Sequence, residues 1–284
     1  MKPTSEAESQ TRNRLRRIEG RHNAALRDLR RAFTRAERTG QDECAIEGVR
    51  IVEEAIRSSL RFRAVFFRES ALSQAERIVP QLGAHVETLL VPDRLFDAAL
   101  PSETPQGVAA LVRLKEFSLD DVMGRLHLGP VLIVVGLQDP GNLGTILRSA
   151  EAFGSAGVVP GEGSVSPFNS KAIRGSAGSV FRLPVVVAKN AGGMEAVSEA
   201  IRTRGVRRLA TSSHKGIPVD QAKLAGPVAI FIGSEGAGVS RSLQAKADEM
   251  LAIPHSPQVE SLNAGVAASI VLYEAARQRR LAAG

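Results

Sequence analysis

Residues 229–274 read AIFIGSEGAGVSRSLQAKADEMLAIPHSPQVESLNAGVAASIVLYE, and the organisation of the second half of the chain follows from this stretch. A first apolar run, Val228–Ile232, has the length of a buried strand and leads into the glycine-rich loop Gly233–Gly238. A second apolar run, Met250–Ile253, is stopped by a proline, and Ser261–Asn263 opens a helix of small residues. Two such loops at the ends of neighbouring strands, beside a helix start, predict a place where backbone N–H and C=O groups face a ligand.

A further buried strand is expected upstream, at Val131–Val135, because an uninterrupted apolar run is typical of the centre of a parallel sheet. The glycine-rich loop 136–144 follows it, and the helical spacing of apolar residues predicts a helix at Thr145–Phe153. Residues 131–284 therefore predict an α/β domain with a parallel sheet. The other elements expected here are strands at 157–159, 185–187 and 208–211 and helices at 169–173 and 193–202.

Strands and helices also alternate through the first half of the chain, which predicts a compact three-layer αβα domain with a mixed or parallel sheet over residues 21–116. We expect residues 1–20 to be disordered or frayed. Residues 117–130 are polar and broken by glycine and proline, which predicts a linker. The expected strands lie at 43–47, 63–67, 85–91 and 107–114, and the expected helices at 23–38, 48–59, 72–79 and 93–99.

The composition is that of an ordinary folded protein, with 26 glycines and 14 prolines in 284 residues. Apolar runs stay well short of the roughly 18–20 residues of a membrane span, and residues 1–17 lack the apolar core of a secretory signal. The single cysteine, Cys44, cannot form an internal disulfide, so we expect a cytoplasmic protein. Cys44 is either a reactive thiol or a buried small apolar residue, and the second interpretation is favoured.

The net charge of +7 is concentrated near the N-terminus, where residues 1–38 carry ten arginines and one lysine against five acidic residues. This asymmetry suggests a polyanionic partner contacted from that end. The arginines fall on one face of the helix expected at 23–38, and this face either is simply solvated or lies against a phosphate backbone. The excess of arginine over lysine suits phosphate recognition, but it is equally the signature of a GC-rich genome.

Several common classes of site do not fit the sequence. The glycines of the loop after the strand at 131–135, Gly136, Gly141 and Gly144, lack the spacing of a dinucleotide-binding turn, and there is no phosphate loop ending in Gly-Lys-Ser/Thr. The five histidines are scattered and the cysteine has no partner at ligand spacing, so we expect no metal. A Gly-x-Ser-x-Gly nucleophile elbow is also missing.

Three ordered motifs remain, and they carry a specific resemblance. The first is Asn142–Ala150 (NLGTILRSA), the second is Phe231–Gly236 (FIGSEG), and the third joins Ile253–Pro254 to Val259–Asn263 (VESLN). In their order and separation they resemble the three motifs of the SpoU/TrmH family of RNA ribose 2′-O-methyltransferases, in the SPOUT class. This resemblance extends from residue 131 to the C-terminus.

The first domain resembles the substrate-binding domain, related to the ribosomal protein L30e fold, that often precedes this catalytic domain. Residues Glu47–Arg50, followed by Glu53–Ala55, and residues Thr104–Val108 carry the likeness. A lysine frequent in the early part of that domain has no clear match near Ala24–Asp28.

The resemblance implies a C-terminal part that threads through a loop as a deep trefoil knot, a topology too rare to derive from pattern alone. It implies S-adenosylmethionine as the cofactor, held mostly by backbone groups, with Gly233, Ile253 and Leu262 at the family's cofactor positions and Ser261 and Asn263 beside them. It also implies a homodimer through the last helix. The stripe of that helix that suits such an interface consists of Leu262, Val266, Ile270 and Tyr273.

Arg148 is the residue that we expect to matter most for catalysis, because the 2′-hydroxyl of a ribose is a poor nucleophile that must lose its proton. In the family this arginine is proposed to help deprotonate the hydroxyl. A guanidinium with a pKa above about 12 is an awkward base, so we favour a phosphate clamp that also stabilises the developing alkoxide.

The other candidate residues have structural alternatives. Asn142 is expected to hold Arg148 or the ribose, or else only to cap its helix. Glu235 is expected to pair with an arginine or to order the glycine-rich loop. Ser261 and Asn263 are expected to contact the active site or to cap the last helix. Arg174 and Arg50 are the candidate ligands of RNA, and Arg174 could equally form a structural salt bridge.

These observations predict an S-adenosylmethionine-dependent methyltransferase of a ribose 2′-hydroxyl in structured RNA. The extra N-terminal domain favours 23S ribosomal RNA over transfer RNA as the partner. The alternatives are methylation of a base on the same fold, and a non-catalytic RNA-binding or ribosome-assembly factor. Neither a metal nor a membrane is expected to take part.

Overall fold

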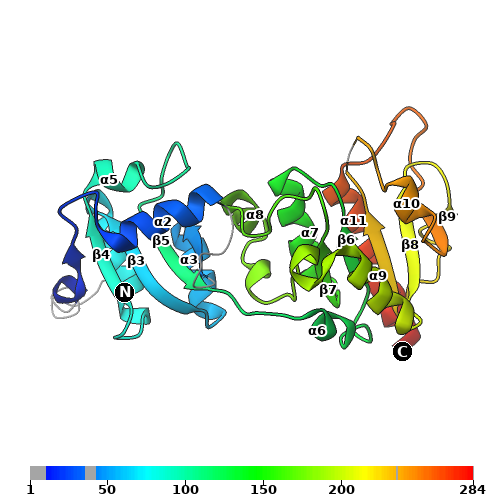
Figure 1. The fold of residues 1–284 in the computed structure, drawn as a ribbon, viewed down its shortest axis with the longest axis horizontal. Coiled ribbons are helices and arrows are strands. Elements are labelled where there is room, and N and C mark those ends of the chain that lie inside the picture. The colour runs from blue at the N-terminus through cyan, green and yellow to red at the C-terminus, as the bar shows by residue number, and fades with distance from the viewer. Residues whose placement is uncertain (1–10, 36–42, 235, 284) are drawn as a thin grey trace. The chain divides into compact units, whose positions relative to one another are not determined.

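The computed structural model describes residues 11–35, 43–234 and 236–283. The chain divides into two compact units, one formed by residues 1–115 with 168–173 and the other by residues 116–167 with 174–284 (Figure 1). No helix in the described part of the chain is both long enough and apolar enough to cross a membrane. The two units are described separately below.

The first unit is built on a five-stranded mixed sheet with the strand order β1-β4-β3-β5-β2. The strands β1, β4 and β3 are parallel to one another, whereas β5 runs antiparallel to β3 and to β2. Nearly every residue of the central strands is buried, since helices lie on both faces of the sheet. The strands are β1 Arg16–Arg17, β2 Glu43–Glu47, β3 Arg61–Arg68, β4 Glu87–Val91 and β5 Val108–Arg113.

In the described part of this unit, helices pack against the sheet; they include α2 Ala24–Arg35, α3 Val49–Arg57, α4 Leu72–Ile78 and α5 Asp93–Asp97. On one face, Leu26 and Leu29 of α2 and Phe96 of α5 pack with alternate residues of the strands in one apolar core. Helix α3 contacts β2 and β5, and α4 contacts β3, on the side of the remaining strand residues. The three-layer prediction therefore fits this unit. The short 3₁₀ turns η1 Glu69–Ala71 and η2 Val79–Gln81 flank α4.

The expectation that residues 1–20 are disordered or frayed is wrong for residues 11–20, and residues 1–10 lie outside the described part of the chain. Ile18 is buried in the core beside α2, and the strand β1 pairs with β4. The guanidinium of Arg14 donates hydrogen bonds to the carbonyls of residues 79, 82 and 83, and the hydroxyl of Thr88 donates to the carbonyl of Arg14. These contacts hold residues 14–18 against the first unit, although the charged composition of the segment suggests that it is exposed to solvent.

The second unit contains a six-stranded parallel sheet with the order β7-β6-β10-β8-β11-β9. The sequence predicted five of these strands, all except β9. Strands β6, β7 and β10 are fully buried, whereas β8 and β11 are only partly buried. The expected strand at 185–187 is reduced to a single bridge between Val185 and Val158. The strands are β6 Val131–Val134, β7 Gly157–Pro160, β8 Arg207–Ser212, β9 Ile217–Pro218, β10 Val228–Ile232 and β11 Glu249–Ala252.

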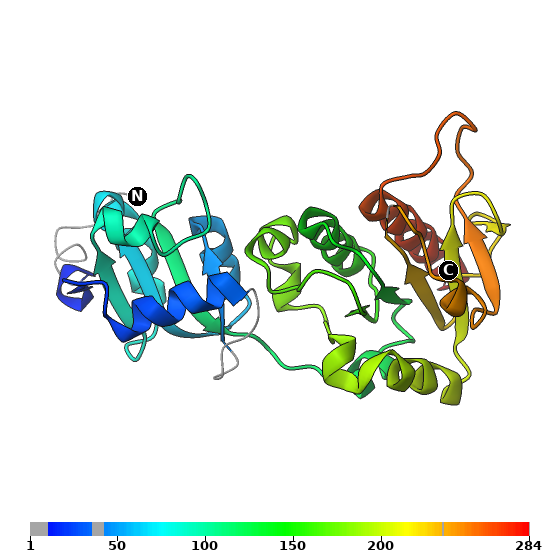
Figure 2. The ribbon, with the colours of Figure 1, turned by 45° about the horizontal axis from the view of Figure 1, so that its top comes forward.

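Helices lie on both faces of this sheet (Figure 2). One core joins α6 and α9 to alternate strand residues such as Ile133 and Phe231. Helices α7 and α11 pack against each other on the opposite face. The helices of this unit are α6 Leu119–Met123, α7 Pro140–Ala152, α9 Gly193–Thr203, α10 Arg241–Gln244 and α11 Ala264–Ala283, with 3₁₀ turns η3 Ser179–Phe181 and η4 Ala188–Ala191. Helix α8 Ser170–Gly175 spans the boundary at residue 173 and is divided between the two units.

The linker expected at 117–130 contains helix α6, whose Val122 and Met123 are buried in the core of the second unit. Ser118 caps this helix, because its hydroxyl accepts a hydrogen bond from the backbone N–H of Asp121 and the Asp121 carboxylate accepts one from Ser118 in return. The glycines and prolines of this stretch suggested a linker, although it contains a short amphipathic helix. The segment is therefore part of the domain rather than a free tether.

Candidate active site

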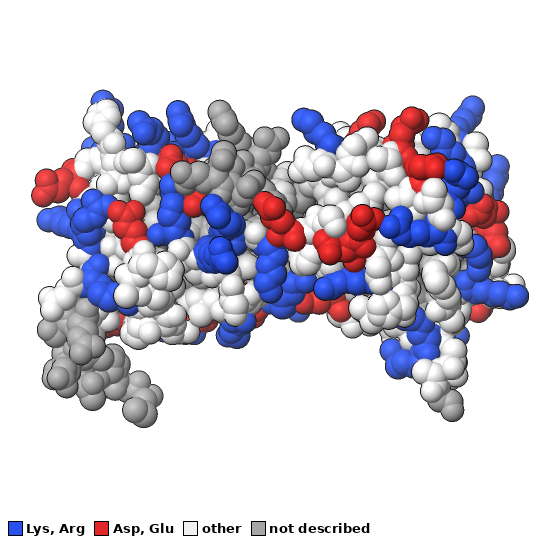
Figure 3. Space-filling view, turned by 60° about the horizontal axis from the view of Figure 1, so that its bottom comes forward, with Lys and Arg blue, Asp and Glu red and all other residues white. Residues whose placement is uncertain are grey.

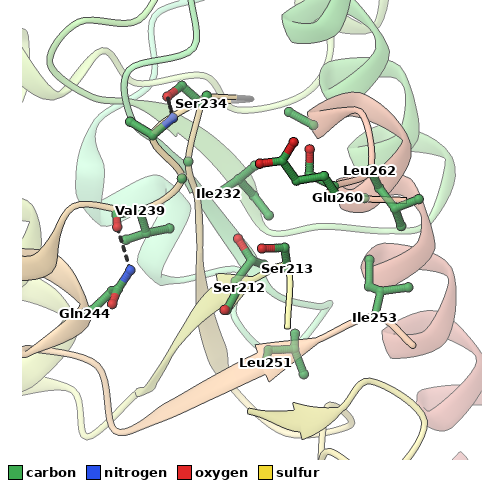
Figure 4. Close-up of a pocket in the computed structure, with 18 of the residues that line it drawn as sticks. Ser212, Ser213, Ile232, Ser234, Val239, Gln244, Leu251, Ile253, Glu260 and Leu262 are labelled. Atoms are coloured by element: carbon green, nitrogen blue, oxygen red, sulfur yellow. Dashed lines mark hydrogen bonds between the residues drawn. The ribbon is translucent and has the colours of Figure 1, made fainter. Parts of the chain in front are cut away.

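A cavity of about 380 Å³ lies at the carboxyl ends of three adjacent parallel strands, β8, β10 and β11. This is the edge of an open α/β sheet at which ligands characteristically bind. The loops that follow the three strands and the segment that precedes α11 form its walls (Figure 4). The lining residues are Thr211, Ser212, Ser213, Ile232–Ser234, Gly236–Val239, Gln244, Leu251, Ile253, His255, Glu260–Leu262, Ala264 and Ala267.

The glycine-rich loop after β10 is a tight backbone turn. Its ends meet at Ser234, which accepts the backbone N–H of Gly238 at 2.9 Å on its carbonyl and that of Ala237 at 3.3 Å on its hydroxyl. Gly238 has φ +62°, a conformation that favours glycine. A Cβ atom on Gly233 would collide with the backbone of Gly238 and Val239. The turn therefore requires glycine at position 233 and exposes backbone groups to the cavity.

The cavity wall combines apolar surface with neutral polar groups. Side chains of Ile232, Leu251 and Leu262 provide the apolar part, and Ser212 and Ser213 at the end of β8 provide hydroxyls. Among the described lining residues the only side chain with a formal charge is a carboxylate, that of Glu260. Apolar walls, hydroxyls and an acid without a lysine or arginine among the lining residues suit a nucleoside-like ligand that carries positive charge.

Helix α7 begins earlier than the predicted Thr145 and has a different cap from the one considered. Asp139 is the N-cap residue, because its carboxylate accepts the backbone N–H of Asn142 at 2.7 Å, and Pro140 occupies the first helical turn. The possibility that Asn142 only caps the helix is therefore excluded. Its side chain instead accepts a hydrogen bond from the amide of Asn263 at 3.0 Å.

Asn263 also begins helix α11, since its side-chain oxygen accepts the backbone N–H of Val266 at 3.2 Å. Ser261, the expected start, precedes the helix and lines the cavity. Helices α7 and α11 approach closely because Gly265 leaves room for Thr145, whose Cβ would lie 3.1 Å from an added Cβ. Residues from the first and third motifs thus meet at the start of two packed helices.

Arg148 is exposed on α7, makes no ion pair with a described residue and does not line the cavity. Glu235 lies outside the described residues. Arg174 is in the last turn of α8, beside Gly175, where an added Cβ would lie 3.3 Å from the Cα of Gly144. Arg50 is exposed in the first turn of α3, in the other unit.

Four of the cavity's residues were predicted from the sequence, namely Gly233, Ile253, Ser261 and Leu262. The polar residues at the end of β8 were not predicted, and neither were His255 and Glu260. The residues at the end of β8 could have been found, because ligands bind beyond the carboxyl ends of parallel strands and a strand was expected at 208–211. No cluster of side chains suited to a metal ion occurs among the residues that the structure describes.

Comparison with protein families gives two matches. Residues 129–273 match the model of the SpoU rRNA methylase family, which accounts for the unit that contains the cavity. Residues 23–110 match the model of the MRM3-like substrate-binding domain.

Individual relatives match over almost their full length. The 23S rRNA (guanosine(2553)-2′-O)-methyltransferase RlmP of Bacillus subtilis is 33% identical over 259 residues, which cover 91% of this chain and 98% of the relative. The 23S rRNA (uridine(2479)-2′-O)-methyltransferase of Streptomyces viridochromogenes is 30% identical and covers 86% of each chain. The crystal structure of the SpoU methyltransferase AviRb from that organism, in complex with the cofactor AdoMet, matches 91% of this chain and 100% of its own, with 28% identity and a TM-score of 0.77.

Proposed function

This chain belongs to the SpoU rRNA methylase family, and we propose that the RNA it methylates is 23S ribosomal RNA. The chain is an S-adenosylmethionine-dependent RNA ribose 2′-O-methyltransferase. The choice of RNA is supported by the two relatives named above, both of which act on 23S rRNA and match over most of their length. The match to a complete relative is the observation that carries this proposal, because it includes the N-terminal substrate-binding domain.

We propose that the cofactor occupies the cavity at the ends of β8, β10 and β11. The volume, the apolar walls and the carboxylate of Glu260 fit a methyl donor that bears a positive sulfonium. Bound there, the cofactor supplies an activated methyl group that leaves a neutral thioether behind. The backbone at Gly233, Ile253 and Leu262, with the hydroxyl of Ser261, would hold its adenosine and amino-acid parts.

We propose that Arg148 acts on the RNA rather than on the cofactor, since it is exposed and lies outside the cavity lining. Its guanidinium would clamp a phosphate and stabilise the oxyanion that develops when the 2′-hydroxyl loses its proton. The hydrogen-bonded pair Asn142–Asn263 would fix the ribose between the ends of α7 and α11. Glu235, in the second motif, would order the glycine-rich loop or pair with an arginine.

We propose that the first unit binds RNA through phosphates. On α2, Arg27 and Arg31 are exposed and have no ionic partner among the described residues, whereas Arg63 and Arg68 are paired with acids. Figure 3 shows Lys and Arg side chains over the surface of one face, interspersed with fewer acidic ones. Arg50 and Arg174 are further proposed contacts of the RNA.

We also propose that the C-terminal part is knotted. Strands β8 and β9 flank β11 on both sides although residues 213–216 join them directly, so this connection crosses β11, with Gly216 against the backbone of Met250. A homodimer through α11 is proposed because Val266 and Tyr273 stay 47% and 50% exposed on it. We place the protein in the cytoplasm, where its ribosomal substrate is assembled.

The substrate is tested in three separate reactions. Each contains the protein, labelled S-adenosylmethionine and one RNA, which is 23S rRNA, 16S rRNA or transfer RNA. We expect label in 23S rRNA alone, and an alkali-resistant dinucleotide after hydrolysis, because a 2′-O-methyl group blocks cleavage of the adjacent phosphodiester. Label in transfer RNA alone would overturn the choice of RNA. Label that alkaline hydrolysis releases in mononucleotides would indicate base methylation. A lack of methyl transfer to any of the three RNAs would support a non-catalytic factor.

A further inference from the structure

Glu260 brings to the cavity a negative charge that no described residue neutralises. Its side chain is exposed and lines the cavity. The carboxylate makes no hydrogen bond or ion pair with a residue that the structure describes, and the described lining contains no lysine or arginine. Figure 4 shows this side chain extending from the segment before α11 toward Ile232, at the end of β10. A ligand in the cavity can therefore reach the carboxylate.

The backbone that carries Glu260 is held on both sides. Before it, the N–H of Val259 donates to the carbonyl of Ser256 at 3.0 Å, which closes a turn. After it, Asn263 begins α11 and donates a hydrogen bond to the side chain of Asn142 on α7. The charge therefore lies on a short stretch between a turn and a helix start, beside the cavity.

The last helix makes no use of this charge. An acidic residue at a helix start can stabilise the helix by accepting one of the unpaired N–H groups of the first turn. At α11 this role belongs to Asn263, whose side-chain oxygen accepts the N–H of Val266. Replacement of the exposed Glu260 by glutamine should therefore leave the free energy of unfolding almost unchanged, so that changes in ligand affinity can be measured on folded protein.

The methyl donor and the product that remains after transfer differ in charge at sulfur. S-adenosylmethionine has a positive sulfonium, whereas S-adenosylhomocysteine lacks the methyl group and has a neutral thioether at the same position. A positive charge that enters a partly apolar cavity loses hydration, and this loss is costly without a counter-charge. A carboxylate in the wall offsets part of the cost for the sulfonium and has no corresponding effect on the thioether.

We propose that the carboxylate of Glu260 makes the cavity select the charged methyl donor over the neutral product. The inference rests on the proposed placement of the cofactor in this cavity. The attraction exists while sulfur bears its positive charge and disappears with the transferred methyl group, which favours exchange of product for fresh donor. Glu260 thus determines which of two nearly identical molecules occupies the site.

Calorimetric titration of Glu260→Gln with both ligands tests this selectivity. Affinity for S-adenosylmethionine should fall about fivefold, as for an ion pair that water can still reach, while affinity for S-adenosylhomocysteine should stay within about twofold of the wild type. Sinefungin, which has an ammonium group in place of the sulfonium, should respond as the methyl donor does. An equal loss for all three ligands, or no loss for the two charged ones, would overturn the inference.

Two further variants control for the position and the sign of the charge. Glu162→Gln removes an exposed acid from the loop after β7, at the same edge of the sheet, but Glu162 does not line the cavity. Its ratio of the two affinities should equal that of the wild type. Glu260→Asp keeps the charge and should keep most of the selectivity. If Glu162→Gln changes the ratio as much as Glu260→Gln does, the effect belongs to the net charge and not to Glu260.

Salt and kinetics provide independent readouts. Because Glu260 is exposed, high salt should screen its charge and reduce the selectivity of the wild type, and should change that of Glu260→Gln much less. In methyl transfer, Glu260→Gln should raise the KM for S-adenosylmethionine, leave the inhibition constant of S-adenosylhomocysteine unchanged and not lower kcat. A large fall in kcat at unchanged KM would contradict the inference. A wild type that binds neither ligand would refute the cofactor's placement itself.

Discussion

At the scale of single residues, Gly233 shows why a short motif is informative. Its side chain is a hydrogen atom because the backbone of Gly238 and Val239 occupies the space where a Cβ would stand. Close approach of two backbone segments is what allows N–H and C=O groups, rather than side chains, to form a ligand site. Gly236, in the same loop, has open space around it.

This contrast provides a matched pair of variants. Gly233→Ala should displace the turn and weaken binding of S-adenosylhomocysteine by at least about tenfold, since the loop forms part of the cavity wall. Gly236→Ala should bind within about twofold of the wild type, because its added methyl group meets no atom within 4 Å. Calorimetry measures both affinities, and equal behaviour of the two variants would refute the role given to Gly233.

Arg148→Ala should lower the rate of methyl transfer by about 10²–10³-fold, the effect of removing one group that stabilises a developing oxyanion. Affinity for S-adenosylhomocysteine should remain that of the wild type, because Arg148 does not line the cavity. Arg202→Ala removes another exposed arginine, on α9, and should leave both quantities unchanged. An Arg148→Ala enzyme that transfers methyl groups at the wild-type rate would exclude this residue from catalysis.

The cofactor residues were expected because the three motifs resemble those of a known family. Gly233, Ile253 and Leu262, which stand at that family's cofactor positions, lie together in the cavity. The hydrogen bond between Asn142 and Asn263 joins residues 121 positions apart, and local pattern contains no information about such a pair.

At the scale of elements, helix α11 is joined to the strand region by a polar cluster at its centre. Glu274 is only 8% exposed, and both of its carboxylate oxygens accept hydrogen bonds from Arg277 at 2.7 Å. Gln278 donates to Glu274 and to the carbonyl of Ala222, and it accepts the backbone N–H of Leu224. The cluster therefore couples the last helix to the segment between β9 and β10.

A pH-dependent contribution to stability follows from this cluster. The hydrogen bonds from Arg277 hold the pKa of Glu274 below its ordinary value of 4.5, against the opposing effect of burial. A carboxyl group whose pKa is lowered by folding stabilises the native state above pH 4.5, and this stabilisation is lost as the pH falls through the native pKa. Glu274→Gln should therefore be less stable than the wild type at pH 7, and the difference should shrink below pH 4.5 in urea denaturation at each pH.

Glu199→Gln is the matched control for that experiment. Glu199 makes the same type of pair with Arg202, three residues further along its helix, and the hydrogen bond from Arg202 likewise lowers its pKa. Its side chain is 57% exposed, so solvent screens the interaction and the loss of stability at pH 7 should be much smaller. If both variants lose the same free energy of unfolding at pH 7, the burial of Glu274 does not strengthen its interaction with Arg277.

Element types were predictable because periodicity is a local property. Continuous apolar runs identified β6 and β10, and the helical spacing of apolar residues identified α2. The failures have specific causes. Helix α7 starts at Pro140 because Asp139 supplies the cap, in a loop that looked too glycine-rich for helix. Helix α6 is short and owes its stability to the burial of Val122 and Met123, which the polar flanks concealed.

At the scale of the whole molecule, the chain combines a substrate-binding unit and a methyltransferase unit. The division between residues 115 and 116 in the structure falls beside the boundary of 116 and 117 expected from composition. The first unit carries the surplus of arginine, and the second contains the cavity. This distribution of charge suggests that affinity for RNA and affinity for the methyl donor are separable properties.

RNA affinity should respond to the free arginines of α2. The double variant Arg27→Gln/Arg31→Gln should bind 23S rRNA more weakly, and the slope of log K against log salt should fall by about one unit for each phosphate that the variant no longer neutralises. Arg57→Gln/Arg77→Gln removes two arginines of the same unit that are paired with acids and should change both quantities less. Filter-binding assays over a range of salt concentrations measure both, and identical slopes for the two double variants would contradict a role of α2 in RNA binding.

Calorimetric titration of the wild-type protein with S-adenosylmethionine tests the proposed cofactor site most directly. We predict saturable uptake of one molecule per chain, which disappears when S-adenosylhomocysteine already fills the site and is weakened by Gly233→Ala. Absence of uptake by folded protein, or uptake that Gly233→Ala leaves unchanged, would show that the loops beyond β8, β10 and β11 do not hold the methyl donor.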